Sequence, residues 1–487
     1  MQKHIRRGIC AFLMTCVMLC AIPNASATRF SDVPASHWAA ADIELCADLG
    51  FINGVTPTLF GLGQPLSRAA CVVILERFFQ WPSADPDNLS YQDIDPTRWY
   101  APALAAAYRQ GVVTDQSRLF RPDEPVTRGE LAVMLVRALG YQTLSGLAGH
   151  SAFADVTANA GYIALAHDMG LVNGNGGKFL PDNAATREQA AAILARLYRK
   201  LAANPRKIGV ISNASGAWYG AGFAATAVRA GQLTGTQDEP IRYSLNASAA
   251  DSLRTQIADS GSGVLLYLSG EALNWNALNA IADAVQNGYA GLLLELTGAS
   301  LEASRVQSLK GLLQNKTLHL IVPAPAQTDD DYPYAALCRL ADSLTVRVLG
   351  QSRLVNGFPT DPVEPLEEVY GALRTLFGPG SALDASKCGL LLSASGSAWT
   401  GAVNTGLVSG AAVEELLRSD GVTSYYSERY ACAYLRRPAD DDTPEQVVWY
   451  PDAKSIAARV QLAKLFNLGG LIVANADGLT DSLIRAF

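Results

Sequence analysis

The sequence is poor in cysteine and in charge, and both shortages exclude classes of protein. Three of its eight cysteines, Cys10, Cys16 and Cys20, lie near the start, and the other five are scattered without a CxxC pair. Such a set supplies neither a disulfide framework nor a zinc site. Charged residues make up 17% of the chain and the net charge is −7, which argues against nucleic acid as a partner. No metal-binding or nucleotide-binding motif is present, and we expect no cofactor.

Long hydrophobic runs are also missing after residue 27. The one long apolar run, residues 9–22, follows a basic start and precedes a small-residue cleavage site at residues 25–27. We therefore expect residues 1–27 to be a secretory signal peptide. The alternative is an uncleaved membrane anchor, but the apolar run is short for a full membrane span. The remaining chain has enough apolar residues for two or three packed domains.

What the sequence does contain is one pattern that occurs three times, at a period of about 60 residues. It opens at residues 30–33 (FSDV), 91–94 (YQDI) and 153–156 (FADV). It closes at residues 66–69 (LSRA), 126–130 (VTRGE) and 185–189 (ATREQ). Self-similarity at a fixed spacing indicates one supersecondary unit used three times, each too small to bury its own core.

Each repeat has the pattern of a helix, a loop and a second helix. In the first repeat the apolar spacing predicts helices over residues 38–49 and from about residue 68 to 79. Three hydroxyl residues are expected to cap the second helices: Ser67, Thr127 and Thr186. Glu130 and Gln189 would complete a capping box in the second and third repeats, whereas Ala70 cannot do so in the first.

Three arginines, Arg68, Arg128 and Arg187, therefore fall at the first position of a helix. A guanidinium at that place lies beside free backbone N–H groups and the positive end of the helix dipole, which suits a carboxylate or a phosphate. The alternative is an arginine that is merely salt-bridged within its own repeat. Three arginines at matched positions favour a shared anion-binding role.

These motifs, with the pairs His37-Trp38 and Arg98-Trp99, resemble S-layer homology (SLH) repeats over about residues 29–200. The resemblance implies an all-α, pseudo-threefold bundle that holds acidic, often pyruvylated, secondary cell-wall polysaccharide. It makes Arg68, Arg128 and Arg187 the ligand-binding residues and the two tryptophans packing residues. We place the repeats at residues 28–88, 89–150 and 151–203. The third repeat departs from the pattern, since it is shorter and lacks the tryptophan.

The rest of the chain, residues 205–487, alternates short apolar runs with helical segments. The runs are residues 208–212, 241–245, 264–268, 291–296, 318–322, 344–349, 390–393 and 471–474. Eight such runs predict an α/β fold, a closed (β/α)8 barrel of the TIM type. The long gap before the last strand would hold a small insertion that contains residues 425–449.

Several stretches of this part resemble family 18 glycoside hydrolases, which include chitinases and wall-associated bacterial enzymes. Residues 288–297 (GYAGLLLELT) align with that family's fourth-strand signature, GxDGxDxDxE. Residues 334–342 and 389–400 are similar to segments at its sixth and seventh strands. Residues 448–455 (VWYPDAKS) are similar to its closing W-Y-x-D-x-x-S segment, the most specific of the four.

The resemblance also implies where a catalytic acid would lie, and there the sequence has changed. The position of the general acid is Thr297, a side chain that cannot supply a proton near neutral pH. The preceding acidic positions hold Ala290, Leu293 and Glu295. The family's Tyr-Asp pair is replaced by residues 347–350 (RVLG), and its last-strand tryptophan falls at about Ala474. We expect a pseudoenzyme that has kept the fold and lost the acid.

Glu295 is the only acidic residue on this signature strand and is a candidate for a displaced catalytic acid. Strand alternation places it on the inward face, with Leu293 and Thr297. A buried glutamate that is partnered by other side chains is the alternative, and we favour it.

Four aromatic residues near the ends of predicted strands are candidates for a glycan groove: Trp218, Tyr219, Trp275 and Trp399. The carboxyl ends of barrel strands form the ligand-binding face, and sugar rings stack on flat aromatic side chains. The alternative is ordinary packing against the outer helices.

Together these features predict an exported protein at the cell wall or S-layer surface. The repeats would anchor it to secondary cell-wall polysaccharide, without a membrane span after signal cleavage. The barrel would bind an N-acetylglucosamine-containing glycan or have a structural role. Two alternatives remain: an active cell-wall or chitin-type hydrolase with a displaced acid, and an adaptor that binds another protein.

Overall fold

The computed structural model describes residues 29–114, 117–149, 152–214, 222–236, 238–243, 247–258, 263–439 and 444–487. The chain divides into two compact units, Met1–Ala202 and Ala203–Phe487. The expected signal peptide lies outside the described residues. Within the described ranges, no helix combines the length and the apolar character that a membrane crossing requires.

The first unit contains two helices from each repeat. They are α2 (Ala40–Asp48), α3 (Arg68–Phe79), α4 (Ala101–Arg109), α5 (Arg128–Ala138), α6 (Ala160–Asp168) and α7 (Arg187–Ala202), with short 3₁₀ turns η1 (Pro86–Asn88) and η2 (Gln142–Gly146). Helix α3 packs on α4, α5 on α6, and α7 on α2. Each pair joins the second helix of one repeat to the first helix of the next, and α7 returns to the first repeat. The three repeats therefore close into a ring within one chain.

At the centre of this ring, extended backbone segments of the three repeats form hydrogen bonds with one another. The N–H of Leu66 donates to Ala185 O (2.8 Å), that of Val126 to Leu66 O (2.8 Å), and that of Ala185 to Val126 O (2.9 Å). Isolated β-bridges flank these bonds, among them Ser67 with Pro125. The expectation of an all-α bundle is thus met only for the helices, because the segments that lead into them pair as strands do.

The starts of the second helices follow the capping pattern of the sequence. Thr127 and Glu130 form a complete capping box at α5. The Ser67 hydroxyl accepts the N–H of Ala70 at α3, with no reciprocal bond. At α7 the side chain of Gln189 accepts the Thr186 N–H at 3.3 Å, but the Thr186 hydroxyl has no partner among the described residues. The third box is therefore half formed.

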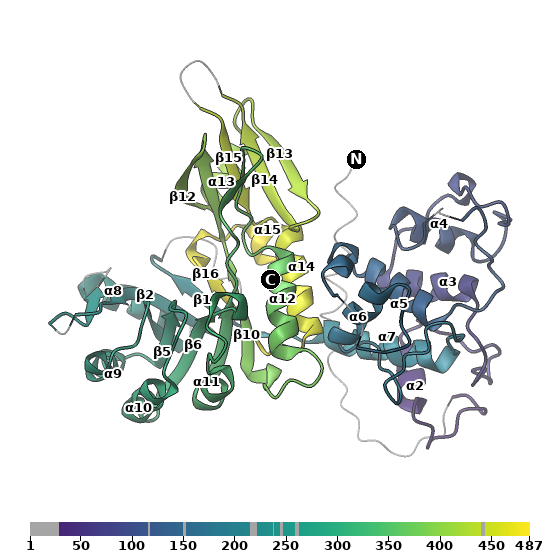
Figure 1. Ribbon diagram of the computed structural model, residues 1–487, viewed down its shortest axis with the longest axis horizontal. Coiled ribbons are helices and arrows are strands. Elements are labelled where there is room, and N and C mark those ends of the chain that lie inside the picture. The colour runs from purple at the N-terminus through teal and green to yellow at the C-terminus, as the bar shows by residue number, and fades with distance from the viewer. Residues whose placement is uncertain are drawn as a thin grey trace. The chain divides into compact units, whose positions relative to one another are not determined.

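The second unit is built on a closed barrel of eight parallel strands (Figure 1). Around the barrel they are β1 (Arg206–Ile211), β2 (Ala225–Leu233), β4 (Gly263–Gly270), β5 (Gly291–Leu296), β6 (Thr317–Pro323), β7 (Ser343–Arg347), β10 (Cys388–Ser393) and β16 (Gly470–Ala474). β1 pairs with both β2 and β16, which closes the sheet. Alternate residues of the strands face inward and form an apolar core that includes Val210, Leu265, Leu293 and Ile321.

Helices follow most of the barrel strands and cover the outside of the sheet (Figure 1). They are α8 (Ala247–Ala258), α9 (Leu278–Gln286), α10 (Ala303–Leu313), α11 (Tyr334–Leu340), α12 (Leu366–Phe377), α14 (Ala453–Leu465) and the short α15 (Asp481–Ile484).

The second strand of the barrel corrects the sequence prediction. The apolar run from residue 241 was expected to be that strand, but its described part, β3 (Ile241–Tyr243), is an antiparallel addition to the end of β2. The barrel strand is β2 instead. Its sequence, ATAVRAGQL, carries Arg229 on the inward face beside small residues, so it lacks the continuous apolar run of a buried strand.

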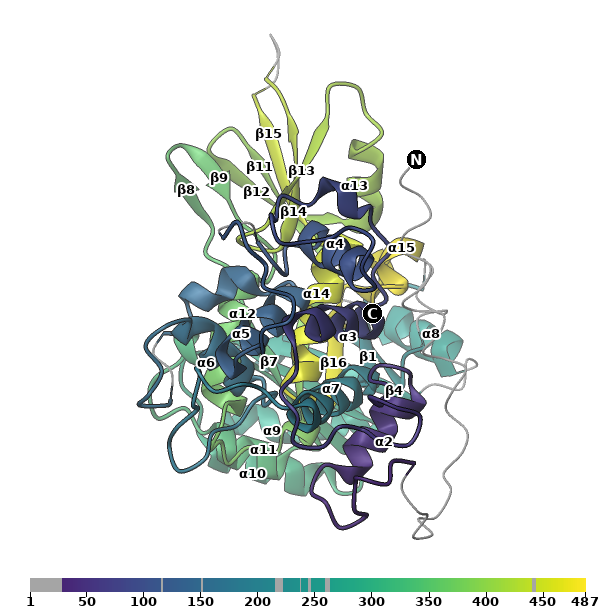
Figure 2. The same ribbon diagram turned by 90° about the vertical axis from the view of Figure 1, so that its right-hand side faces the viewer.

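An antiparallel sheet of five strands is inserted between β10 and β16 (Figure 1). Its strands are β11 (Ser395–Thr400), β12 (Val403–Ser409), β13 (Thr423–Ser427), β14 (Cys432–Arg437) and β15 (Gln446–Tyr450), and α13 (Gly410–Leu416) follows β12. A hairpin of β8 (Arg353–Val355) and β9 (Phe358–Thr360) lies beside this sheet (Figure 2). The Trp449 indole donates to Pro359 O at 2.9 Å, which joins hairpin and sheet.

One buried arginine fastens the insertion to the barrel. Arg459 of α14 is 1% exposed. Its guanidinium donates to five backbone carbonyls, those of Val363, Glu364, Tyr430, Ala431 and Ser455. A guanidinium has five N–H donors, so this cluster of carbonyls can satisfy it completely.

Candidate functional site

The matched arginines of the first unit each begin a helix and reach into the neighbouring repeat. In each case Nε donates to a phenylalanine carbonyl, and the guanidinium carbon lies over the ring of the same phenylalanine. The pairs are Arg68 with Phe120 (2.7 Å and 5.0 Å), Arg128 with Phe179 (2.8 Å and 4.7 Å) and Arg187 with Phe60 (2.9 Å and 5.0 Å). These contacts fix the guanidinium by a hydrogen bond and a cation–π interaction.

The aspartate of each opening motif holds the loop that carries this phenylalanine. Asp93 accepts the N–H groups of Phe120 (2.8 Å) and Arg121 (2.6 Å). Asp155 does the same for Phe179 (2.8 Å) and Leu180 (2.7 Å). These backbone bonds lower the pKa of Asp155, because they stabilise its charged form. The opening and closing motifs therefore build one site together.

The three sites differ in what else the arginine contacts. Arg68 Nη1 forms an ion pair with Glu130 of the next repeat at 2.5 Å, whereas Arg128 Nη1 meets the neutral amide of Gln189 at 3.3 Å. Ala70 occupies the matched position for Arg187 and offers no acceptor. A ligand anion would have to compete with a carboxylate at Arg68, but not with the corresponding side chain at the other two arginines.

A groove of about 260 Å³ lies at Arg128 and is lined by all three repeats. α5 contributes Arg128, α7 contributes Gln189 and Arg196, and the first repeat contributes Trp38. The two arginines give the groove positive charge, and the indole offers a flat apolar face. This combination suits an anionic sugar.

Trp38 and Trp99 are not packing residues, contrary to the expectation from the resemblance. Trp38 is 64% exposed and Trp99 is 62% exposed. Both precede the first helix of their repeat, so the apolar helix pattern that buries α2 and α4 does not include them.

In the barrel, Glu295 lies at the carboxyl end of β5 and faces inward, as strand alternation predicts. Arg347 Nη1, at the end of β7, lies 3.1 Å from Glu295 Oε1. The Tyr267 hydroxyl donates to Glu295 Oε2. Burial raises the pKa of Tyr267 well above its ordinary value, so the hydroxyl keeps its proton and remains a donor. Both carboxylate oxygens are thus occupied, as in the partnered glutamate that we favour from the sequence.

A second arginine joins this polar layer from β2. The Arg229 guanidinium carbon lies 4.5 Å from the centre of the Tyr267 ring. Its Nη1 is 3.5 Å from the Tyr267 hydroxyl, and its Nη2 is 3.5 Å from Asn475 Oδ1. The carboxyl end of the barrel interior therefore holds two arginines around one tyrosine–glutamate pair. Thr297, which the resemblance to family 18 hydrolases aligns with the general acid, has a hydroxyl that lies 3.4 Å from Gly270 O.

The four candidate groove aromatics do not come together. Trp218 and Tyr219 lie outside the described residues. Trp275 begins the 3₁₀ turn η4 (Trp275–Ala277) after β4 and is 54% exposed, so its ring is available. Trp399 is 6% exposed inside the inserted sheet, where its indole N–H donates to Asp361 at 3.3 Å. Trp399 cannot offer its ring to a sugar there, which corrects that candidate.

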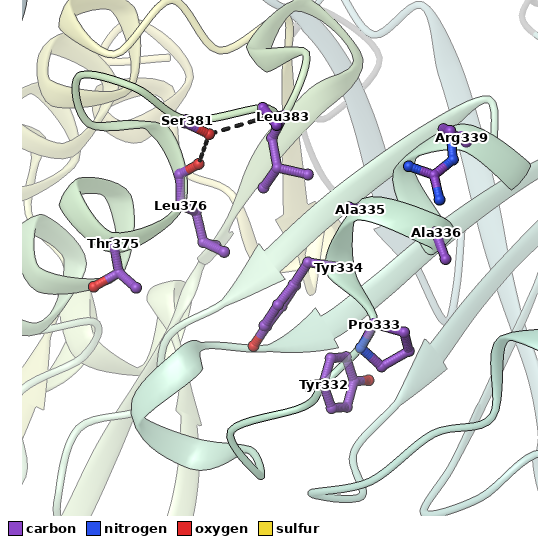
Figure 3. A pocket seen from close by; sticks show the side chains of 11 residues that line it. Tyr332, Pro333, Tyr334, Ala335, Ala336, Arg339, Thr375, Leu376, Ser381 and Leu383 are labelled. Atoms are coloured by element: carbon purple, nitrogen blue, oxygen red, sulfur yellow. Dashed lines mark hydrogen bonds between the residues drawn. The ribbon is translucent and has the colours of Figure 1, made fainter.

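A separate hollow of about 550 Å³ lies on the outer face of the barrel, between α11 and α12 (Figure 3). Among the described residues that line it, Arg339 alone is charged. The Tyr334 hydroxyl donates to Pro323 O at 2.9 Å, so it is already bonded. The described residues that line this hollow do not bring several free polar groups together. The hollow is therefore not a candidate glycan-binding site.

The sequence reasoning missed Arg229 and the tyrosine that it covers. Arg229 belongs to the strand that was not predicted, and Tyr267 fits the pattern of an apolar core residue. One signal was available, because arginine and tyrosine at inward positions of neighbouring strands indicate a polar layer rather than core.

Comparison with known proteins agrees with the motifs of the first unit. A family model described as the S-layer homology domain matches residues 29–70, 90–132 and 152–191. The chain carries three S-layer homology repeats. These SLH repeats imply anchoring at the cell surface.

Two curated relatives are similar to this part of the chain. S-layer protein sap of Bacillus anthracis is 26% identical over 208 residues, 42% of this chain and 25% of that protein. Exoglucanase XynX of Acetivibrio thermocellus is 28% identical over 180 residues, 35% of this chain and 16% of that protein. The chain spans a quarter or less of the length of these relatives.

Solved structures similar to the chain include a chitinase from Chromobacterium violaceum. That structure is 17% identical, covers 58% of this chain and 98% of its own chain, and has a TM-score of 0.47. The closed strand order, rather than this likeness, defines the barrel described above.

Proposed function

We propose that this chain is an exported cell-surface protein whose SLH repeats bind acidic secondary cell-wall polysaccharide and whose barrel binds glycan without hydrolysing it. The observation that carries the anchoring half is the Arg128 groove, where two arginines and an exposed tryptophan converge. A pyruvylated sugar carries a carboxylate, which the arginines of this groove can bind, and its ring can stack on the indole of Trp38.

The triple variant Arg68→Ala, Arg128→Ala and Arg187→Ala tests the anchoring half. We expect it to remain in the supernatant when it is mixed with purified wall sacculi that pellet the native protein. The control is Arg418→Ala, an arginine whose side chain is 74% exposed and which belongs to the second unit. Sedimentation of the triple variant with the wall would contradict the proposed role of the arginines.

The state of Glu295 supports the second half, a barrel without hydrolase activity. A general acid must donate a proton to the leaving oxygen. Glu295 instead accepts from Tyr267 and is ion-paired with Arg347, and Thr297 has no acidic proton. Trp275 remains as an exposed aromatic surface after β4 for a sugar ring.

Mass spectrometry of products tests this half. The full chain is incubated with chitooligosaccharides and with peptidoglycan, beside the Glu295→Gln variant. We expect no cleaved product from either protein and retained binding of one glycan. Cleavage that is abolished by Glu295→Gln would establish a hydrolase with a displaced acid. Absence of both products and binding would favour a protein partner.

A further inference from the structure

The polar layer at the carboxyl end of the barrel leaves one arginine without a carboxylate. Arg229 has two contacts at 3.5 Å, to the Tyr267 hydroxyl and to Asn475 Oδ1, and lies over the Tyr267 ring. No carboxylate among the described residues forms an ion pair with it. A partly buried guanidinium loses much of its hydration, and weak contacts to neutral groups offset little of that loss.

Two described carboxylates at this end of the barrel already have partners. Glu295 is held by Arg347 and by Tyr267, one partner for each oxygen. Asp477 follows β16, and its Oδ2 accepts three N–H groups, one from Ser212 and two from Asn213. Neither side chain is free to turn toward Arg229 without breaking these bonds.

The second arginine of the layer also keeps a spare donor. Arg347 Nη1 forms an ion pair with Glu295, but the buried Nε of Arg347 has no hydrogen-bond partner among the described residues. A buried N–H without a partner is costly, and such groups in native proteins usually meet a water or a ligand. Both arginines thus present unused donors beside the same tyrosine–glutamate pair.

We propose that this layer is a binding site for the anionic group of a saccharide, with Arg229 as its principal ligand and Arg347 as a second donor. A guanidinium offers a planar fork of N–H groups that fits the two oxygens of a carboxylate or a phosphate. The carboxyl end of a parallel barrel is the face that receives ligands. The inference rests on the proposed glycan binding of the barrel and specifies an acidic glycan in place of a neutral one.

Titration calorimetry with three related sugars tests the site. They are N-acetylglucosamine, which is neutral, N-acetylmuramic acid, which carries a carboxylate, and N-acetylglucosamine 1-phosphate. The protein is the full chain with Arg68→Gln, Arg128→Gln and Arg187→Gln, so that the three wall-binding arginines do not contribute. We expect an acidic sugar to bind at least about tenfold more tightly than the neutral one. The tighter of the two acidic sugars identifies the anionic group.

Two variants in the same background assign the effect to Arg229. Arg229→Gln should weaken acidic-sugar binding by about tenfold and leave the neutral sugar unchanged. The matched control is Arg254→Gln, since Arg254 also lies over a tyrosine ring, Tyr289 at 5.8 Å, but belongs to the outer helix α8. If Arg229→Gln lowers the melting temperature, Arg229→Lys keeps the charge and should retain part of the preference for the acidic sugars.

The outcomes separate this inference from the proposed function. Equal affinity for all three sugars, unaffected by Arg229→Gln, would overturn the anionic site and leave glycan binding intact. Absence of binding by any sugar would overturn both the site and glycan binding by the barrel. Wall sedimentation of the full chain with its native arginines tests the anchoring half independently.

Discussion

The Nη1 atom of Arg68 lies 2.5 Å from Oε1 of Glu130, so the arginine of the first repeat is neutralised by the glutamate of the second. The corresponding partner of Arg128 is the uncharged side chain of Gln189. Three repeats with one motif therefore present sites of unequal charge, and the groove at Arg128 has the advantage for an anion.

The first prediction ranks two of the arginines. Arg128→Gln should weaken wall binding by about tenfold or more, since a hydrogen bond to a charged group contributes about 1.5–3 kcal/mol. Arg68→Gln should weaken it by less than about threefold, because its charge is already balanced by Glu130. Quantitative sedimentation with sacculi measures both. Equal losses would show that the ion pair does not set the ranking.

The second prediction transfers that ion pair to the better groove. Gln189→Glu places a carboxylate opposite Arg128, as Glu130 lies opposite Arg68, and the new carboxylate can still accept the Thr186 N–H that Gln189 accepts. We expect weaker wall binding together with an unchanged or slightly higher melting temperature. Gln142→Glu, in the 3₁₀ turn η2 outside the groove, is the control for added negative charge. Wall binding of Gln189→Glu that matches the native protein would refute the idea that the groove needs a free arginine.

The third prediction concerns Trp38. Because this side chain is 64% exposed, Trp38→Ala should change the melting temperature little and still weaken wall binding, through loss of the indole face. Leu147→Ala removes another exposed apolar side chain, 48% exposed, and should affect neither measurement. A large loss of stability in Trp38→Ala would return this tryptophan to a packing role.

The fourth prediction is a pH dependence of stability that originates in the barrel unit. Burial raises the pKa of Glu364 from 4.5 to about 7. Between these values the folded chain holds a proton that the unfolded chain releases, so this group makes stability fall as pH rises from about 4.5 to 7. Glu364→Gln should remove that contribution, and its stability relative to the native protein should increase across the same window.

A second buried group, His319, changes stability with pH in the opposite direction. The native protein and the Glu364→Gln variant must therefore be compared at each pH. Burial lowers the pKa of His319 from 6.5 to about 4, and its contribution to stability is lost as pH falls through that range. Denaturant unfolding of the native protein and of Glu364→Gln at pH 5 and pH 7.5 isolates the contribution of Glu364 to the free energy of unfolding. A difference between them that is the same at the two pH values would contradict the raised pKa.

The fifth prediction tests the tight packing beneath an SLH loop. A Cβ at Gly174 would lie 2.3 Å from Phe153 Cε1 and 2.7 Å from Lys178 O, and the backbone oxygen cannot yield easily. Gly174→Ala should cost about 1–3 kcal/mol of unfolding free energy in the first unit. Gly146→Ala, where the added atom meets nothing within 4 Å, is the control. Similar melting curves for the two variants would show that the loop relaxes.

The repeats could be predicted in detail because their signals are local. α3 spans Arg68–Phe79, as the apolar spacing and Ser67 predict, and the box at Thr127 is formed. Capping bonds and helical periodicity involve neighbours a few residues apart, which a sequence displays directly. The pairing of α7 with α2 joins segments more than 100 residues apart, and no local pattern encodes it.

The barrel was predictable where its strands are apolar and not where they are polar. Seven of the predicted runs coincide with barrel strands, whereas β2 was missed because Arg229 interrupts its inward face. Trp399 was misplaced for a related reason. A tryptophan that follows a barrel strand can belong to an inserted strand, as Trp399 belongs to β11, and no local pattern indicates the sheet that covers it.

The ring of hydrogen bonds through Leu66, Val126 and Ala185 determines what happens when one SLH repeat is deleted. A stack of repeats can lose its last member at the cost of one interface, and the others remain folded. A closed ring has no last member. Removal of any one SLH repeat removes two of the three interfaces. It also removes one wall of the Arg128 groove, which all three repeats line, so natural or engineered truncation should abolish anchoring in a single step.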